Sequence, residues 1–331
     1  MSTQPQERDR YVALSGGVGG AKLSLGMAHL LGERLTIVVN TGDDFEHLGL
    51  HISPDVDTAI YTLAGVVNPV TGWGRRDETW TFMAALQRLG GQAWFKLGDA
   101  DLATHVERTR RLRAGETLTS ITAHLAQSFG VKSRILPMCD EPLRTVVETD
   151  QGPLAFQDYF VRAQCRPIVR TVRFDGAESA QPSPQVRAAL SDSALAGIIV
   201  CPSNPWLSVD PILAVPGLRE AIRASGAPVI AVSPIIAGNA VKGPTAKIMR
   251  ELDLQPGAAS IAQHYAGLID GFLIDSEDCA LADTIAMPVR AARTLMHSLD
   301  DKVGLARECL DFCAALKLAR GREARATGVP S

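Results

Sequence analysis

Acidic residues and histidines crowd one short stretch of the chain, NTGDDFEHLGLHISPDVDT, which runs from residue 40 to residue 58. The stretch contains two histidines and five carboxylates: Asp43, Asp44, Glu46, Asp55 and Asp57. It begins directly after the apolar run LTIVV, which predicts a buried strand. Carboxylates in this position typically bind a metal ion, a phosphate-bearing ligand held through a metal, or a ribose hydroxyl.

The sequence DVD within this stretch predicts a magnesium site. Asp55 and Asp57 would point to the same side of an extended backbone. Two convergent carboxylates suit Mg²⁺, which completes its shell with water and substrate phosphate. With Asp44 they form the expected set of metal ligands. Ser53 and Pro54 also predict the start of a helix over VDTAIYTLAG, and because capping and metal binding are compatible, we expect both.

No residue stands out as a general base. The carboxylates of Asp43 and Asp57 are the expected catalytic groups, and the imidazole of His105 would also serve as a base. His47 and His51 are expected to pack the loop or to orient a substrate rather than to bind the metal.

A glycine-rich segment, SGGVGGAKL, lies between a strand pattern and a helical pattern. Glycines there let backbone N–H groups approach an anion, and the helix N-terminus adds its dipole. The segment is neither a P-loop, since its lysine follows alanine, nor a strict GxGxxG, since lysine occupies the third glycine position. The alternative is a tight strand-to-helix turn that needs small residues. The residues expected to contact a nucleotide are Gly16, Gly17, Gly19, Gly20 and Lys22.

A nicotinamide-dependent enzyme is a rival interpretation. Asp43 and Asp44 follow the second predicted strand, where a dinucleotide-binding fold carries its ribose-binding acid. The incomplete glycine fingerprint and the second acid pair, in SPDVDT, argue against it. A metal-dependent reaction on a phosphate ligand is therefore the stronger hypothesis.

Three further segments, FKLGDADLATHV, CPSNPW and SPIIAGNAVKGPTAKIM, carry polar residues that suit a ligand. In the first, Asp99 or Asp101 is expected to be the N-cap of a helix. Such folds bind ligands in the loops at the carboxyl ends of parallel strands, so we expect all five segments at one edge of a sheet. The polar residues of these three segments are Lys96, Asp99, Asp101, His105, Ser203, Asn204, Asn239 and Lys247.

The elements that position these loops follow from the apolar pattern. Residues 11–14 and 35–40 predict strands and residues 21–31 predict a helix, which together form a parallel β-α-β crossover. The runs LAGIIVCPSNPW, APVIAVSPIIAG and IDGFLIDSED repeat the alternation. The pattern predicts an α/β fold: a Rossmann-like parallel sheet with helices on both faces.

The middle of the chain has a different pattern, mainly helical up to residue 130 and then typical of short strands. We expect a nucleotide-binding core over residues 11–76 and 190–315. Residues 77–189 are expected to form a helical, α+β insertion that flanks the active site. Flexible tails are expected over residues 1–10 and 318–331.

The composition excludes several classes of function. Of 331 residues, 46% are hydrophobic and 21% are charged, which is typical of a soluble globular protein. The formal net charge of -3 argues against nucleic-acid binding through a broad positive field. No apolar run approaches the length that spans a bilayer, and the N-terminus lacks the hydrophobic core of a signal peptide, so we expect a cytoplasmic protein with no membrane partner. The cysteines form no CxxC pair, which argues against structural zinc.

Seven segments, in the expected order over about residues 11 to 300, resemble the 2-phospho-L-lactate transferases of coenzyme F420 biosynthesis. They are GGVGGAKL, NTGDDFEHLGLHISPDVDT, KLGDADLATHV, LPMCDEP, QDYFVR, CPSNPWLSVDPIL and SPIIAGNAVKGPTAKIM. The resemblance implies transfer of a phospholactyl-type group from a guanosine-diphospho three-carbon acid to the deazaflavin Fo. The ribityl hydroxyl of Fo attacks, GMP leaves, and Mg²⁺ is required. Displacement at phosphorus needs charge neutralisation and positioning more than covalent catalysis, which suits a metal, backbone N–H groups and lysines.

The resemblance also assigns roles to residues. Those expected to contact Fo are Asp57, Lys96, Asp99 and His105. The glycine-rich segment is expected to hold the guanosine diphosphate portion, together with Ser203, Asn204, Asn239 and Lys247. The chain departs from many relatives at Ala100, where they carry arginine between the acids of the LGDxD block, so any ligand contact of that arginine is missing here.

Three points stay open at the level of sequence. The donor acid is lactyl, enolpyruvyl or glyceryl, since no motif distinguishes them. The oligomeric state is undetermined, with a homodimer as our hypothesis. The alternative function is a non-catalytic, nucleotide-sugar-binding regulator of the related fold family, which keeps a similar glycine-rich opening; the segments SPDVDT and KLGDADLATHV favour the transferase.

Overall fold

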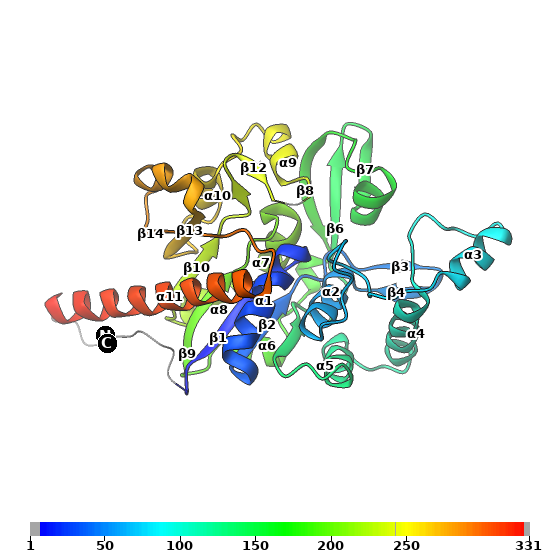
Figure 1. Cartoon of the computed structure of the whole chain (residues 1–331), viewed down its shortest axis with the longest axis horizontal. Helices are drawn as coiled ribbons and strands as arrows, with labels where there is room; N and C mark the ends of the chain where they lie inside the picture. The colour runs from blue at the N-terminus through cyan, green and yellow to red at the C-terminus, as the bar shows by residue number, and fades with distance from the viewer. Residues whose placement is uncertain (1–6, 242, 328–331) are drawn as a thin grey trace.

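The fold is built around one parallel sheet (Figure 1). The computed structural model describes residues 7–241 and 243–327. Within these residues a seven-stranded sheet has the order β14-β13-β10-β9-β1-β2-β5, and all of its pairings are parallel, as the alternating pattern predicts. Its strands are β1 (Arg10–Ser15), β2 (Leu35–Val39), β5 (Arg134–Pro137), β9 (Leu195–Val200), β10 (Val229–Val232), β13 (Gly271–Asp275) and β14 (Val289–Ala292).

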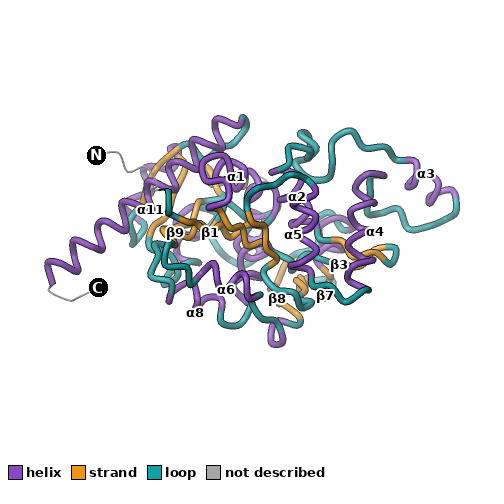
Figure 2. The backbone as a smooth tube through the Cα atoms, turned by 90° about the horizontal axis from the view of Figure 1, so that it is seen from below, coloured by secondary structure: helices purple, strands orange, loops and turns teal. Residues whose placement is uncertain are grey.

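Helices cover both faces of the sheet because successive residues of a buried strand point to opposite sides. In β1, Tyr11 and Ala13 enter one core and Val12 and Leu14 the other. Figure 2 shows α1 and α11 on one side of β1 and β9, with α6 and α8 on the opposite side. The first face carries α1 (Gly17–Leu31), α2 (Pro54–Leu63), α5 (Leu118–Ser128) and α11 (Leu299–Thr327); the second carries α6 (Pro184–Leu190), α7 (Asp210–Ala214), α8 (Leu218–Ala224), α9 (Thr245–Glu251) and α10 (Ala258–His264).

The remaining elements extend from the β2 and β5 end of the sheet, where the cyan and green segments lie in Figure 1. They include α3 (Thr81–Arg88), α4 (Asp99–Arg113), a hairpin of β3 (Phe45–His47) and β4 (Leu50–Ile52), and an antiparallel sheet of β6 (Arg144–Thr149), β7 (Gly152–Ala155) and β8 (Val169–Asp175). The shorter elements are β11 (Ile235–Ile236), β12 (Asn239–Ala240), η1 (Gly32–Arg34), η2 (Asp158–Arg162), η3 (Ala177–Ser179), η4 (Pro205–Val209) and η5 (Ser276–Thr284).

The structure divides the chain differently from the sequence pattern. Strand β5 lies inside the predicted insertion over residues 77–189, yet it pairs with β2 in the main sheet. The chain therefore leaves the main sheet after β2, returns for β5 and leaves again for β6 to β8. Residues 318–327, which the sequence assigned to a tail, continue α11 to Thr327. Residues 1–6 and 328–331 lie outside the described residues.

No helix in residues 7–241 and 243–327 combines the length and the apolarity needed to cross a membrane.

Candidate active site

The loop after β2 begins with Asn40, whose side chain joins three segments of the chain. Its Oδ1 accepts a hydrogen bond from the backbone N–H of Gly42 at 2.8 Å. Its Nδ2 donates to Asp55 Oδ2 at 2.9 Å and to the backbone oxygen of Leu207 at 3.4 Å. Because β1, β2 and β9 are neighbours in the sheet, this contact brings the β2 loop, the start of α2 and the loop after β9 together at one edge. Of the five predicted segments, this contact brings together the stretch of residues 40–58 and the one that follows β9.

Three buried carboxylates, those of Asp43, Asp44 and Asp55, lie around this loop. Burial and the charge of Asp55 raise the pKa of Asp43 well above its usual range. Burial also raises the pKa of Asp55 to about 6, although hydrogen bonds from Asn40 and the backbone of Gly17 oppose the rise. Asp43 Oδ1 and Asp44 Oδ1 are buried and have no hydrogen-bond partner among the described residues. Close, buried carboxylates with unpartnered oxygens fit a cation such as Mg²⁺.

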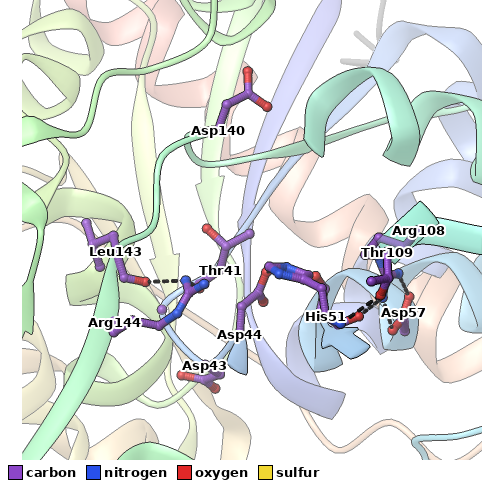
Figure 3. A network of polar contacts seen from close by, with 12 residues as sticks. Thr41, Asp43, Asp44, His51, Asp57, Arg108, Thr109, Asp140, Leu143 and Arg144 are labelled. Carbon is purple, nitrogen blue, oxygen red and sulfur yellow. Dashed lines mark hydrogen bonds and ion pairs between the residues drawn. The ribbon is translucent and has the colours of Figure 1, made fainter. Parts of the chain in front are cut away.

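The second oxygen of Asp44 is held in place by two side chains. Ser53 Oγ donates to Asp44 Oδ2 at 2.7 Å, and His51 Nε2 lies 3.1 Å from the same oxygen. Figure 3 shows His51 beside Asp44. His51 lies in β4 and Ser53 follows that strand directly, so the end of the hairpin orients the carboxylate. His51 therefore orients a candidate ligand.

Asp55 and Asp57 do not converge as the sequence suggested. Residues from Pro54 onward are helical, with both acids in the first turn of α2, so the prediction of extended backbone is wrong and that of a helix start is confirmed. Residues two apart on a helix are separated by about 200° around its axis. Asp55 therefore meets Asn40, whereas Asp57 faces α4.

Asp57 belongs to a second buried network, centred on Arg108. Arg108 Nη1 donates to Asp57 Oδ2 at 3.0 Å and Nη2 donates to Oδ1. His105 bridges two acids, with Nδ1 at 3.6 Å from Asp57 Oδ2 and Nε2 at 3.4 Å from Asp101 Oδ2. The hydroxyl of Tyr61 donates to Asp101 Oδ1 at 2.7 Å. The network ties α2 to α4.

The two networks differ in how well they suit a divalent cation. Asp57, Asp101 and His105 offer ligand atoms within 4.8 Å of one another. However, the guanidinium of Arg108 already neutralises Asp57, and a cation there would be repelled by it. Among the described residues Asp44 and Asp55 form no ion pair with lysine or arginine, although their ligand atoms do not gather as closely as those of the Asp57 group.

The glycine-rich segment packs closely against the loop after β9. Gly17 begins α1 with a φ of 61°. A Cβ on Gly19 would lie 2.3 Å from the backbone oxygen of Pro202, and one on Gly20 would lie 2.8 Å from Ser203 Oγ. Ser203 Oγ donates in turn to the backbone oxygen of Gly16 at 2.7 Å. The need for small residues is thus confirmed, and the N-terminus of α1 stays beside the carboxylates.

Two predicted nucleotide contacts have other partners. Lys22 Nζ donates to the backbone oxygen of Met296 at 2.9 Å. Lys247 Nζ donates to the backbone oxygen of Pro167 at 2.9 Å and forms an ion pair with Glu251. Both lysines therefore tie together distant parts of the chain.

The loops of Asn204 and Asn239 differ in their relation to the site. Asn204 Oδ1 caps η4 through the backbone N–H groups of Trp206 and Leu207, and its Nδ2 donates to Thr245 Oγ1 at 3.1 Å. Asn204 is thus linked to the Asn40 contact through Leu207. Asn239 Nδ2 donates to the backbone oxygen of Ala237, two residues before it, at 3.1 Å.

Near Lys96 the structure corrects the predicted N-cap of α4. The N-cap of α4 is Gly98, and Asp99 instead accepts hydrogen bonds from Thr81 N and Phe82 N, so it caps α3. Glu78 accepts hydrogen bonds from the backbone N–H groups of Ala100 and Asp101, which caps α4.

The side chain of Lys96 is exposed. It follows an aromatic cluster, in which ring centroids lie 4.8–6.1 Å apart, formed by Phe45, His47, Trp94 and Phe95.

Sequence reasoning missed three residues that organise the site: Asn40, Arg108 and Tyr61. Asn40 is the first polar residue after β2, which was an available signal. Arg108 follows His105 by about one helical turn, so the sequence already indicated that the two residues share a helix face. Its complete burial was not readable, since arginine is almost never fully buried unless it is paired.

Comparisons with known proteins match the sequence of this chain to a family. A family model described as 2-phospho-L-lactate transferase CofD matches residues 11–302. A phosphoenolpyruvate transferase of Streptomyces griseus subsp. griseus is 38% identical over 318 residues, which cover 93% of this chain and 99% of that protein. One of Mycobacterium ulcerans is 39% identical over 327 residues, covering 92% of this chain and 98% of that protein.

A solved structure agrees with the fold at low sequence identity. It is a upf0052 family protein from Bacillus halodurans, with a TM-score of 0.63 and 15% identity, and the match covers 91% of this chain and 99% of that one. The family model and the relatives extend over nearly all of the chain that builds the sheet and both buried networks. The chain therefore belongs to the 2-phospho-L-lactate transferase CofD family.

Proposed function

We propose that the protein transfers a phosphorylated three-carbon acid from a guanosine-diphospho donor to the ribityl hydroxyl of the deazaflavin Fo. The hydroxyl oxygen forms a bond to the phosphorus that carries the acid. The bond from that phosphorus to the bridging oxygen breaks, and GMP leaves with the electron pair. The product is a precursor of coenzyme F420. The observation that carries the proposal is the group of buried carboxylates with unpartnered oxygens beside the N-terminus of α1.

Asp44 and Asp55 are the proposed ligands of Mg²⁺, which when bound would neutralise the phosphate oxygens of the donor. Asn40 and His51 hold these two carboxylates in position. Asp43 is the proposed acceptor of the hydroxyl proton, because Asp57 is already paired with Arg108. The backbone at the N-terminus of α1 adds N–H groups and a helix dipole that favour an anion.

The acceptor is proposed to lie on the side of α4. Lys96 is exposed there, and the neighbouring aromatic cluster offers ring faces to a flat, conjugated ligand. Asp57 on α2 and His105 on α4, which lie 3.6 Å apart at their nearest polar atoms, are further proposed contacts of the acceptor. For the donor, the relatives named phosphoenolpyruvate transferase support an enolpyruvyl group as the first to test.

The test is mass spectrometry of the product formed from Fo and each of the lactyl, enolpyruvyl and glyceryl donors. We expect a phosphodiester of Fo with at least one donor, and its loss after exhaustive chelation. Failure of all three donors, together with no binding of Fo in a fluorescence titration, would favour the regulator instead. Full turnover without a divalent cation would remove the metal from the proposal.

Asp44→Asn tests the proposed ligand directly. We expect transfer to fall by about 10²–10³, and Mg²⁺ to raise the melting temperature of the wild type but not of the variant. Asp77→Asn is the matched control, since the side chain of Asp77 is 90% exposed. Equal effects of the two substitutions would contradict the assignment.

A further inference from the structure

Arg144, the first residue of β6, reaches back to the loop that carries the carboxylates. Its Nη1 donates to the backbone oxygen of Leu143 at 3.0 Å and to that of Thr41 at 3.5 Å. The oxygen of Thr41 also accepts from the backbone N–H of Asp44, at 3.2 Å. One carbonyl therefore links the guanidinium to the turn that presents Asp43 and Asp44. Figure 3 shows the guanidinium of Arg144 between Leu143 and Thr41, on the side of Asp43.

The guanidinium has no anionic partner within the described chain. Arg144 is partly buried, and no carboxylate oxygen among the described residues lies within 4.0 Å of it. Both contacts are to neutral backbone oxygens, made by one terminal nitrogen. A partly buried cation without an anionic partner, beside the carboxylates, fits an anionic group of a ligand.

The place of Arg144 in the site, rather than the shape of its guanidinium, favours a carboxylate over a phosphate. A guanidinium presents a planar fork of donors that matches two oxygens of either group. The phosphates of the donor already have the proposed metal ligands and the N-terminus of α1, whereas no residue is yet assigned to its carboxylate. All three versions of the donor share that carboxylate. We infer that Arg144 binds the carboxylate of the three-carbon acid, an inference that rests on the proposed function.

The experiment measures binding of two stable ligands in the absence of Fo. One is guanosine diphosphate esterified with lactate, and the other is the isopropyl ester, which replaces only the carboxylate with a methyl group. We expect the wild type to prefer the lactyl ligand by about ten- to hundredfold, the range for hydrogen bonds to a charged group. Arg144→Gln should reduce this preference to nearly one while it leaves the affinity for GDP within about twofold of the wild type.

Two variants control for charge and for structure. Arg173→Gln removes a cation from β8, where Arg173 is 48% exposed and pairs with Glu148, and should keep the wild-type preference. Arg144→Lys keeps the charge but loses the fork, and should give an intermediate preference. A merely structural role of Arg144 would weaken GDP and both esters equally. That result, an unchanged preference in Arg144→Gln, or no preference in the wild type would overturn the inference.

The inference and the proposed function fail separately. Suppose that the wild type transfers the lactyl group to Fo and that Arg144→Gln still prefers the lactyl ligand over the isopropyl ester. The assigned role of Arg144 would then be wrong, and the proposed transferase activity would stand. A preference that depends on Arg144, without transfer of any donor to Fo, would do the opposite.

Discussion

Arg108 on α4 holds both carboxylate oxygens of Asp57 on α2 in a contact that is almost closed to solvent. The side chain of Arg108 is 0% exposed and that of Asp57 is 7% exposed. Burial raises the pKa of Asp57, and the charge of Arg108 opposes this rise. The pair connects the segment of α4 to the first turn of α2, whose Asp55 belongs to the carboxylate group. The relative position of the two networks therefore depends on this contact.

Removal of one charge of the Asp57–Arg108 pair should lower the free energy of unfolding much more than removal of both charges. Arg108→Met leaves a buried carboxylate uncompensated, and we expect it to lower the free energy of unfolding by about 3–5 kcal/mol. The double variant Asp57→Asn/Arg108→Met should recover part of this loss, as measured by urea denaturation. Arg110→Met is the control, because Arg110 is 61% exposed on the same helix and should change stability by at most about 0.5 kcal/mol. If the double variant lost as much unfolding free energy as the two single variants together, the two side chains would not be coupled.

Lys96→Ala should weaken binding of Fo and leave binding of GDP unchanged. The ammonium acts as a point charge on one ligand, and Lys96 lies on the side of α4 that we assign to the acceptor. Calorimetric titration with each ligand gives the two affinities. Lys132→Ala is the matched control, since Lys132 is also exposed and precedes β5, at the amino ends of the parallel strands. Loss of GDP affinity in Lys96→Ala would mean that the two pockets are reversed.

Lys247→Ala should change stability rather than affinity for GDP. The ammonium of Lys247 is engaged by Pro167 and Glu251, which connects α9 to the segment before β8. We expect a loss of about 0.5–1 kcal/mol in the free energy of unfolding, the upper range for a partly exposed ion pair. A large loss of GDP affinity in a variant of normal stability would restore the role that the sequence suggested.

Alanine at two glycines separates close packing from ligand binding. A Cβ on Gly19 meets the backbone of Pro202, and one on Gly26 would lie 2.1 Å from the backbone oxygen of Lys302. Each substitution should cost about 1–3 kcal/mol through overpacking. Only Gly19→Ala should also weaken donor binding, because Gly26 contacts α11 away from the carboxylates. Calorimetric titration with GDP measures the affinity of each variant, at temperatures chosen so that the two variants are equally stable. Equal affinities for GDP would mean that the glycines of this segment serve packing alone.

Asp275→Asn should lower stability at neutral pH more than at acid pH. Although burial acts to raise the pKa of Asp275, hydrogen bonds from the backbone of Glu277 and from Thr294 lower it below 3.8. A folded-state pKa below the unfolded one stabilises the protein above the unfolded value, and this contribution is lost as the pH falls through the folded value. We expect the variant to lose about 1–2 kcal/mol at pH 7, with the difference shrinking below about pH 4. Urea denaturation over a pH series would refute this if the difference grew toward acid.

The fold class was readable from the sequence because its signals are local. Runs such as LTIVV and LAGIIV, separated by helical patterns, form β2 and β9 with every residue buried. The glycine-rich turn places α1 directly after β1. The edge that would carry the chemistry followed from the same rule, since the loops after parallel strands meet at one side.

The direction of individual side chains was not readable with the same certainty. Asp55 and Asp57 would share a side in a strand and diverge in a helix, and the sequence SPDVDT is compatible with both. In the structure Pro54 begins α2, so the two acids join different networks. β5 was likewise assigned to an insertion, because nothing in its four residues shows that it pairs with β2 across almost 100 residues.

The sequence by itself determined the parallel sheet, the acidic loop after β2 and the family, because periodicity and ordered motifs are properties of neighbouring residues. Only the tertiary structure decided which charges meet. Asp57 and Arg108 are 51 residues apart, and Thr41 and Arg144 are 103 residues apart. Such pairs depend on how α4 and β6 pack against the sheet. Burial then decides their chemistry, since a carboxylate or guanidinium removed from water needs a partner that the local sequence does not specify.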